Sequence, residues 1–573
     1  MKRGVTTALA LLLAAIATAS IWRHPASLAS SYDWRYFQTT LEAARRSFVW
    51  FAQVPLYNPW MCGGEPQLAN PQSLAGSPAM LFIVLFGVAL GQKLMLLAFV
   101  SAGIDGSYRL ARSLSLSFYG AATAAASFGL CGWIVLHFGI GHVSFFGAAL
   151  IPHLLWTYVR AKDDPRFVIG AGLVLAVIVT QGGNSTAAMA GIALSVVAIA
   201  DALVTRRTRP LVILVAAALA GVALSAYRLF PAAEFAIVHP RHTTENDRQG
   251  VVELLQSAFT LLGSGKLRGH RYAIHEYGWR LPFLAWPLAL LGVIACARTP
   301  RPPATMIAIV AVLAVAGIGI ALGDTWPYGP WWVMRQLPVL RDLRVPSRYV
   351  LLAALAFSLC AGIGADWLSR AGKAVGLVVL AVVSVDAAVY ANTNLSTVFA
   401  LTPPPIERGT TPLHQVKGHY SRMLELVFAN HGVIGCDEEA PLTRAAQLDL
   451  DDVPQVKLDD ATAGTARVVR WSPNQLEIEV DRTQPTRPIV LLVNLNWNEH
   501  WHSDDGEVVR FGPKWPADRD GGRLALRVSS QQRVVHLRYL PRTFVWGVIV
   551  SMLALLLSAL VVLRRTTRVS QRS

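Results

Sequence analysis

The chain has 573 residues, of which 53% are hydrophobic and only 15% charged, and its mean hydropathy is +0.43. This composition lies outside the range of soluble globular proteins and predicts a chain embedded in a lipid bilayer. The formal net charge of +16 arises largely from basic residues in short loops between apolar segments, so it gives no support for nucleic-acid binding.

Apolar segments recur along most of the chain. A helix needs about 20 mainly apolar residues to cross the hydrocarbon core of a bilayer. We expect about twelve spans, at residues 5–22, 92–112, 116–136, 142–160, 167–182, 184–203, 210–230, 280–297, 304–322, 347–368, 374–392 and 543–563.

The distribution of Lys and Arg predicts the orientation of these spans, because basic loops stay on the cytoplasmic side. Every second connection is basic, from Lys2 and Arg3 at the start to Arg564 and Arg565 in the tail. Both termini are therefore expected in the cytoplasm. The first apolar stretch also resembles a signal peptide, whose cleavage would leave the remaining topology unchanged. The expected external loops are 23–91, 231–279, 323–346 and 393–542.

The five cysteines are scattered, and three of them lie in apolar spans. No CxxC pair occurs. The sequence therefore predicts no disulfide framework.

The first external loop begins with a helical pattern over residues 34–52, in which apolar side chains repeat every three or four positions. Charged residues occupy the other side, so we expect this helix to lie flat on the membrane surface. Asp33 precedes it, and its position alone favours a helix N-cap over a catalytic role. The apolar positions are Phe37, Leu41, Ala44, Phe48 and Phe51.

A tightly turned segment follows at residues 55–72, where Pro, Gly and Asn are too dense for a helix or a strand. A plain linker is one interpretation, but linkers rarely carry such a specific order of Trp, Tyr and Asn. The candidate substrate-loop residues here are Asn58, Trp60, Gly63, Gly64, Asn70 and Gln72.

The second long loop, 231–279, is rich in His and acidic residues. No pair of them has the helical spacing that would place two metal ligands on one face, so solvated loop histidines are the favoured interpretation. The residues are His239, His242, Glu245, Asp247, His270, His275 and Glu276.

Residues 393–542 change from helical to alternating periodicity, for example at 476–480 and 524–528. The alternation predicts a β-sandwich, preceded by a mixed segment with a helix near 420–430. Trp497 and Trp501 end one strand and suggest sugar stacking, although core tryptophans at a sheet edge are the commoner outcome. We expect three regions: 1–392, 393–542 and 543–573.

Three stretches together resemble the YfhO family of bacterial membrane proteins, which look like glycosyltransferases of the GT-C structural class. The first is Asp33 followed by the run at 55–72. The second is Leu-Arg-Val-Pro-Ser-Arg-Tyr at 343–349, and the third is Tyr-Leu-Pro at 539–541 with Phe544 and Gly547.

The resemblance implies a mainly α, GT-C-like transmembrane helical bundle with an external β domain before the last helix. It also implies a multi-pass protein of the bacterial inner (cytoplasmic) membrane that transfers a sugar from a polyprenyl-phosphate donor to an envelope glycan or lipid acceptor. The position that matches the catalytic base of the class is Asp33, and Glu65 is the nearest candidate for a second carboxylate. A divalent cation is compatible with this chemistry but is not required by the sequence.

The leaving phosphate needs positive charge, which Arg supplies through two-pronged hydrogen bonds. Arg344 and Arg348 precede a late span, where the start of a helix also favours an anion. Contact with lipid head groups or with Asp342 is an equally good interpretation. For Arg335 and Arg341 it is the better one.

Two other functions fit the same pattern of spans. One is a transporter or flippase-like protein that moves a glycolipid without chemistry, although no internal repeat is evident. The other is a non-catalytic assembly factor of the cell envelope.

Overall fold

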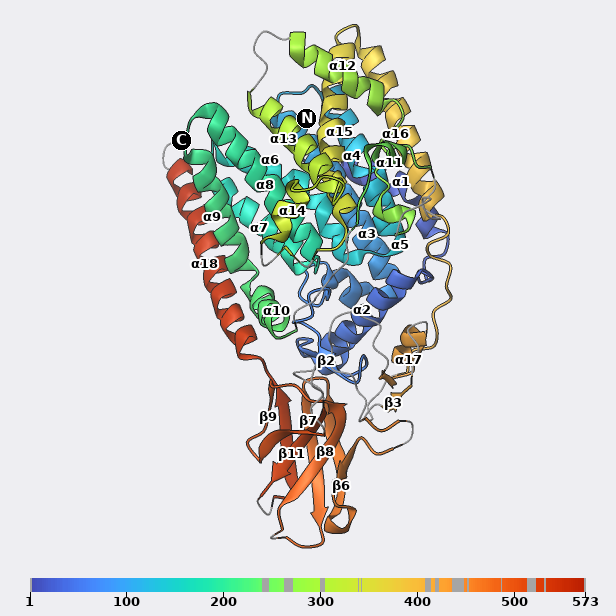
Figure 1. The fold of residues 1–573 in the computed structure, drawn as a ribbon, viewed down its shortest axis with the longest axis vertical. Helices are drawn as coiled ribbons and strands as arrows, with labels where there is room; N and C mark the ends of the chain where they lie inside the picture. Colours follow the sequence, from blue (N-terminus) through green and yellow to red (C-terminus); the bar gives the residue numbers. More distant parts are fainter. Residues whose placement is uncertain are drawn as a thin grey trace.

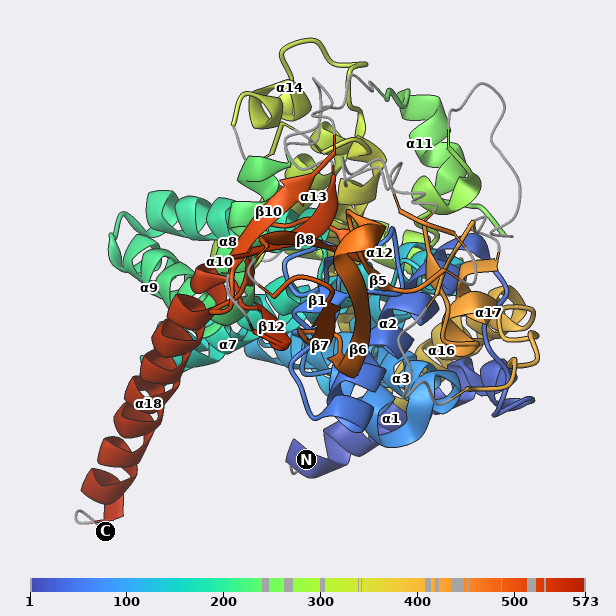
Figure 2. The same ribbon diagram turned by 90° about the horizontal axis from the view of Figure 1, so that it is seen from below.

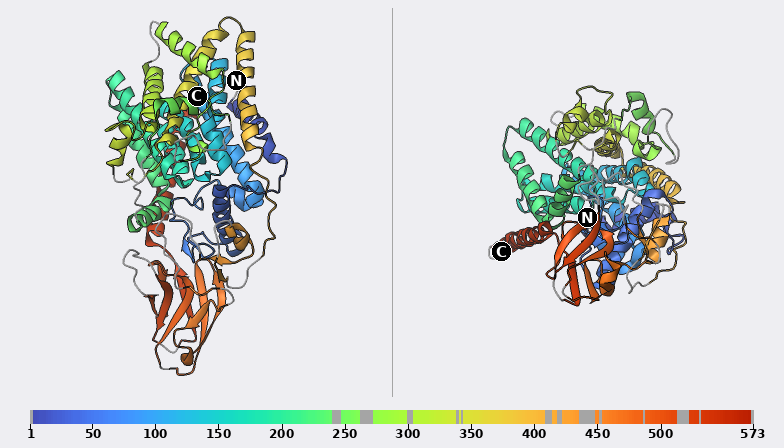
Figure 3. Two further views of the ribbon diagram at one scale, coloured as in Figure 1. Left: turned by 45° about the vertical axis from the view of Figure 1, so that its right-hand side comes forward. Right: turned by 60° about the horizontal axis from the view of Figure 1, so that its bottom comes forward.

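A computed structural model of the chain describes residues 3–239, 247–261, 272–298, 304–337, 340–341, 343–407, 414–417, 422–434, 448–450, 453–485, 487–512, 522–529 and 532–570. The helices gather in one elongated body, and most of the strands form a separate domain at one end (Figure 1). Both termini lie toward the end of the helical body that faces away from the strand domain, as a second view also shows (Figure 3).

The helical body is built from apolar helices, most of which lie where spans were predicted. The helix expected at 92–112 begins earlier, at Met80, and the span expected at 116–136 is divided between two helices. The apolar helices are α1 (Arg3–Ala17), α3 (Met80–Ser113), α4 (Phe118–Gly129), α5 (Gly132–Ile140), α6 (Ile151–Ala161), α7 (Arg166–Thr180), α8 (Asn184–Thr205), α9 (Arg209–Leu224), α10 (Ala226–Val238), α12 (Ala285–Arg298), α13 (Ala304–Ala321), α15 (Val350–Ser369), α16 (Lys373–Leu395) and α18 (Arg542–Ser570). Short helices η1 (Ala19–Trp22), η2 (Val143–Leu150), η3 (Ile274–Glu276), η4 (Pro346–Tyr349), α11 (Val251–Ser257) and α14 (Pro330–Arg335) lie between them.

Within the described residues, six helical segments are long and apolar enough to cross a membrane, or seven if the bent pair α9 and α10 is one span. Four shorter apolar helices accompany them. The chain is a multi-pass membrane protein, while the expected total of about twelve spans stays a prediction.

Helix α15 is the centre of the helical body and packs between α4, α12 and α13. Small residues allow the close approach. A Cβ on Gly364 would lie 2.0 Å from the Leu288 carbonyl oxygen of α12, and one on Gly362 would lie 2.6 Å from the Gly120 carbonyl oxygen of α4. Such contacts are typical of helices packed inside membranes.

The predicted surface helix is present as α2 (Tyr32–Phe51), but its expected exposure is wrong. Glu42 and Arg46, on the face expected to be exposed, are 1% and 0% exposed. Arg46 donates to Glu42 over 3.1 Å and to the carbonyl oxygen of Phe428 over 3.2 Å. Phe428 belongs to α17 (Met423–Phe428), so α17 covers the charged face that was expected to meet water.

The strand domain is a sandwich of two four-stranded sheets, ordered β10-β11-β8-β5 and β6-β7-β12-β9, which confirms the predicted sandwich architecture. Viewed from the strand end, it lies across the helical body (Figure 2). Its strands are β5 (Val456–Leu458), β6 (Gly464–Ser472), β7 (Gln475–Arg482), β8 (Ile489–Asn496), β9 (Trp501–His502), β10 (Glu507–Phe511), β11 (Arg523–Val528) and β12 (Val534–Tyr539), with η6 (Ala461–Ala463) between β5 and β6. A separate pair, β3 (Gln415–Val416) and β4 (Gly432–Val433), lies beside α17.

The segment at 55–72 joins the two parts of the molecule. It folds as a short hairpin of β1 (Tyr57–Asn58) and β2 (Glu65–Pro66), and the Asn496 amide donates to the carbonyl oxygens of Cys62 and Gly64. A Cβ on Gly64, where φ is +105°, would lie 2.2 Å from the Tyr57 hydroxyl oxygen, so only glycine fits.

The expectation that no disulfide forms is wrong at Cys62, which is disulfide-bonded. Cys131, Cys296 and Cys360 carry free thiols, as expected for cysteines in apolar helices. Local spacing reveals only nearby cysteine pairs, so a bond between distant segments leaves no signal of that kind in the sequence.

Candidate active site

The turn between α5 and η2 positions the first part of the site. Gly141 has φ +106°, and a Cβ there would lie 2.4 Å from the Trp34 backbone nitrogen. The Trp34 indole donates to the carbonyl oxygen of Gly139 over 3.1 Å. The Ser31 hydroxyl donates to the carbonyl oxygen of Ile140 over 2.6 Å. These contacts lock the start of α2 against the turn that carries the next residue, His142.

Asp33 lies in the first turn of α2, but it is not the helix cap that its position suggests. The N-cap residue is Ser31. The Asp33 carboxylate oxygen instead lies 2.9 Å from Nε2 of His142, and its side chain is 31% exposed. The cap expectation is therefore wrong, because a long-range partner holds the carboxylate.

The charge state of Asp33 follows from its surroundings. Burial by itself raises the pKa of this carboxyl, but the hydrogen bond and charge of His142 and the charge of His275 outweigh it, so the pKa is lowered. Asp33 is consequently ionised at neutral pH and can accept a proton.

A buried ion pair forms the opposite side of the site. Nε of Arg348, in η4, donates to Glu276 over 2.7 Å, and Nη2 makes a second contact with the same carboxylate. The Ser347 hydroxyl donates to the Glu276 carbonyl oxygen over 2.8 Å, which fixes the loop. Burial by itself raises the pKa of the Glu276 carboxyl. The charge and hydrogen bonds of Arg348 outweigh this effect and hold the pKa well below its usual range.

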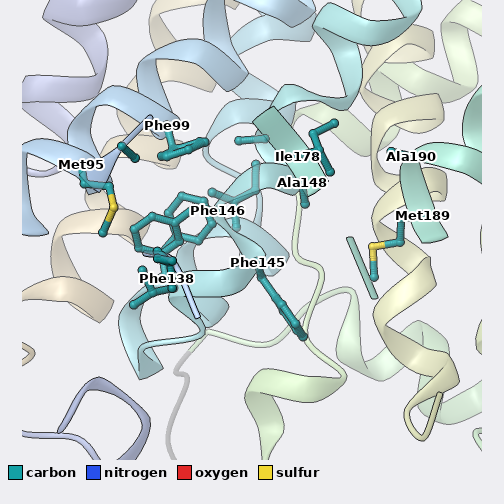
Figure 4. Close-up of a cluster of buried hydrophobic side chains, with 14 of the residues drawn as sticks. Met95, Phe99, Phe138, Phe145, Phe146, Ala148, Ile178, Met189 and Ala190 are labelled. Atoms are coloured by element: carbon teal, nitrogen blue, oxygen red, sulfur yellow. The ribbon is translucent and has the colours of Figure 1, made fainter. Parts of the chain in front are cut away.

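An aromatic ring supports this ion pair. The Arg348 guanidinium lies 4.7 Å from the ring centre of Phe145 in η2. Figure 4 shows that Phe145 points away from the neighbouring Phe146, whose ring lies 4.0 Å from that of Phe138 in the apolar core. Of these two consecutive residues in η2, Phe145 contacts Arg348 at the site and Phe146 packs in the apolar core.

Two histidines extend the site behind Asp33. Nδ1 of His142 lies 2.7 Å from Nδ1 of His137, so one nitrogen donates and the other accepts. Asp33, His142 and His137 therefore form a continuous hydrogen-bonded chain. The His275 ring lies 5.3 Å from that of His142.

His137, His142 and Glu276 could also hold a metal ion, because one ligand atom of each lies within 4.8 Å of the others. Each of the three residues already has a partner for one of its ligand atoms, however. A metal on both Nδ1 atoms would displace their shared proton, and Glu276 would have to turn from Arg348. The donor set fits a divalent cation only after these contacts open.

His275 should make the stability of the protein depend on pH. Burial lowers the pKa of its imidazole to about 4, although the charge of Glu276 opposes the shift. The unfolded chain, with a His pKa of about 6.5, binds the proton first, so stability falls as pH drops from 6.5 toward 4.

His275 alone is expected to make the free energy of unfolding about 2 kcal/mol lower at pH 5 than at pH 7. Thermal unfolding of the detergent-solubilised protein at both pH values measures it, and His275→Gln should reduce the difference. An equal pH dependence in the two proteins would contradict this assignment. Asp33 and Glu276 have lowered pKa values, so the stability that each contributes is lost only at lower pH.

The predicted site residues fall into two groups. Asp33 and Arg348 lie in one cluster, where the charge of Asp33 acts on Arg348, and Arg344 is half-buried just before η4. The second group belongs to the segment that joins the two parts of the molecule, and consists of Asn58, Trp60, Gly63, Gly64, Glu65, Asn70 and Gln72.

Contacts in this second group are mainly structural. The Asn58 amide lies 3.5 Å from Glu65, which is 3% exposed. The Trp60 indole donates to Asn430 over 3.0 Å, and the Gln72 backbone donates to the Asn70 side chain over 2.9 Å. Among the acidic residues that the structure describes, Glu276 rather than Glu65 has the charge that acts on the pKa of Asp33.

Sequence reasoning missed His137 and His142 and set aside His275 and Glu276. The first two lie at a glycine-rich break between predicted spans, and polar residues at such a break are the signal that could have found them. Of the other residues in the His-rich loop, His242, Glu245 and His270 lie outside the described residues.

No family model matches the sequence, and no curated protein matches it. Among solved structures, the chain is similar to the arabinofuranosyltransferase AftD from Mycobacteria, with 17% identity and a TM-score of 0.44 over 69% of this chain and 27% of that one. It is similar to ArnT from Cupriavidus metallidurans bound to undecaprenyl phosphate, with 14% identity and a TM-score of 0.46 over 76% and 86% of the two chains.

A third similar structure is the Archaeoglobus fulgidus oligosaccharyltransferase, with 11% identity and a TM-score of 0.43 over 77% of this chain and 65% of that one. The chain thus spans about a quarter of AftD and most of ArnT. Likeness at these values does not carry activity, substrate or mechanism from those proteins to this one.

Proposed function

We propose that the chain is a membrane glycosyltransferase of the GT-C type, related to the YfhO family, that moves a sugar from a polyprenyl-phosphate donor to an envelope glycan or lipid acceptor. The observation that carries the proposal is the position of Asp33. It is an ionised, partly exposed carboxylate that is hydrogen-bonded to His142 and faces the charge of Arg348.

In the proposed reaction, Asp33 accepts the proton of the acceptor hydroxyl while its oxygen attacks the anomeric carbon of the donor sugar. The bond between that carbon and the phosphate oxygen breaks, and its electron pair leaves with the polyprenyl phosphate. Attack opposite the leaving group inverts the anomeric configuration.

The histidines behind Asp33 support its role as a base. A carboxylate acts as a base only while it is ionised and held toward the hydroxyl whose proton it accepts. His142 lies within hydrogen-bond distance of Asp33 and of His137. Because Nε2–H of His142 donates to the ionised carboxylate, we assign His142 to orienting Asp33 toward the acceptor hydroxyl.

Arg348 has the geometry to bind the departing phosphate. Its two contacts with Glu276 use Nε and Nη2, which leaves Nη1 for a phosphate oxygen. Arg344 supplies a second charge just ahead of η4. We therefore assign the second carboxylate of the site to Glu276, as the partner that orients Arg348, in place of Glu65.

The disulfide at Cys62 supports an external position for the loop that contains the site, because disulfides persist in oxidising compartments. The strand domain lies on the same side, and the termini lie toward the opposite end (Figure 1). This arrangement supports the proposal of a bacterial inner-membrane protein with both termini in the cytoplasm.

One observation favours the alternative of a glycolipid transporter. Helices α9 and α10 pass the span criterion together but are bent by 85° at their junction, and interrupted helices are common in transporters. The bend has a local cause, since Arg228 of α10 donates to the carbonyl oxygens of Leu68, Asn70 and Ser73 and ties α10 to the external loop.

Mass spectrometry of envelope glycans from cells with and without the protein tests the proposed function. We expect one sugar substituent to disappear and its unmodified acceptor to accumulate. Restoration by the Asp33→Asn protein would favour transport, and unchanged glycans would contradict the proposal.

A further inference from the structure

A second cluster of ionisable side chains lies at the seam between the helical body and the strand domain. Glu234 belongs to α10, whereas Glu499 and His500 belong to the turn between β8 and β9. One ligand atom of each lies within 4.8 Å of the others. The three residues border a small, partly open cavity, which also contacts Pro66 and Ala69 of the joining segment.

The geometry of this cluster leaves two carboxylates close together. Nε2 of His500 lies 3.3 Å from a Glu234 oxygen and 3.9 Å from a Glu499 oxygen. The Thr543 hydroxyl donates to Glu234 over 2.5 Å. This hydrogen bond leaves the negative charge of the Glu234 carboxylate in place. Two negative charges facing one imidazole favour a bound cation.

A buried hydroxyl in the same cavity is an independent observation. Tyr539 is 1% exposed and lines the cavity, and in the described part of the chain its hydroxyl makes no hydrogen bond. Burial, together with the charges of Tyr57, Glu234 and Glu499, raises the pKa of this phenol, so the group stays protonated. A buried hydroxyl without a partner is costly, and a water or ion in the cavity would satisfy it.

We propose that Glu234, Glu499 and His500 bind a divalent cation of the Zn²⁺ or Mn²⁺ class, which fastens the strand domain to α10. One imidazole and two carboxylates suit these ions, whereas Mg²⁺ and Ca²⁺ prefer oxygen ligands alone. A water on the fourth coordination position would donate to the Tyr539 hydroxyl oxygen.

Backbone contacts hold the ligands in place for this role. The His500 amide donates to the Asn498 side chain over 3.1 Å, and the Leu540 amide donates to the His500 carbonyl oxygen over 3.0 Å. Since α10 and the β8–β9 turn come from different parts of the chain, an ion shared between them closes a long loop. Metal loading should therefore raise the temperature at which the strand domain unfolds.

The test uses the full-length protein in detergent after treatment with a chelator. Zn²⁺ is added, and bound zinc is measured by equilibrium dialysis alongside thermal unfolding. We expect saturable binding that raises the unfolding temperature. Glu499→Gln and His500→Gln should each weaken this binding at least about 10-fold.

His502→Gln is the matched control, because His502 lies two residues away on β9, is exposed and does not line the cavity. It should bind zinc like the wild-type protein. Glu499 is 52% exposed, so its replacement preserves packing and decides the question if His500→Gln fails to fold.

Three outcomes overturn the proposal. They are a wild-type protein without saturable binding, equal binding by the wild-type, Glu499→Gln and His500→Gln proteins, and binding that disappears in His142→Gln but persists in Glu499→Gln. The last outcome would place the ion in the Asp33 cluster. None of them bears on the proposed sugar transfer, which does not involve this cavity.

Discussion

Replacing Asp33 with Asn is expected to lower the rate of sugar transfer about 10³-fold, because the amide cannot accept the proton of the acceptor hydroxyl. The change is nearly isosteric, and the amide oxygen can still accept a hydrogen bond from His142. The initial rate of transfer by purified protein, at saturating donor, measures the effect.

Asp460→Asn is the control for this experiment, since Asp460 is a half-exposed residue of the strand domain that caps η6 by accepting a hydrogen bond from Thr462. It should transfer sugar at the wild-type rate. The Asp33→Asn protein should also bind the donor as tightly as the wild-type protein does. Transfer within a few fold of wild type would remove Asp33 from the role of base.

Replacing Arg348 with Ala is expected to lower the free energy of unfolding by about 3–5 kcal/mol, because it leaves the Glu276 carboxylate charged and buried. The side chains of this pair are 15% and 6% exposed. Denaturant or thermal unfolding in detergent measures the loss.

A second substitution separates the lost pair from a general packing defect. The double variant Arg348→Ala with Glu276→Gln should recover part of the stability, since no uncompensated charge remains. Arg527→Ala is the matched control, because its partner Glu507 is on the surface and both side chains are more than half exposed. Exposed pairs contribute only about 0–1 kcal/mol. Equal losses in Arg348→Ala and Arg527→Ala would contradict the account.

The membrane architecture could be predicted from the sequence, because the apolar spans and the alternating strands are local patterns. Thus α15 and α16 begin and end within a few residues of the predicted spans, and β7 and β11 match the alternating runs at 476–480 and 524–528. The exposure of α2 could not be predicted, since α17, almost 400 residues later, covers Glu42 and Arg46.

The candidate site was predicted only in part for the same reason. Asp33 and Arg348 were found because each lies in a distinctive stretch. Their partners His142 and Glu276 come from segments about 110 and 70 residues away. No sequence spacing encodes such contacts. Glu65 was chosen because it is near Asp33 along the chain, but folding brings Glu276 to that site instead.

The central claim is that the Asp33 cluster cleaves a polyprenyl-phosphate sugar. The most direct test is to place the purified full-length protein in vesicles with a labelled polyprenyl-phosphate sugar and an envelope acceptor fraction. We predict release of free polyprenyl phosphate in equal amount to a glycoside of inverted configuration, with no nucleotide sugar present. Movement of intact donor across the bilayer, without cleavage in either the wild-type or the Asp33→Asn protein, would contradict the claim.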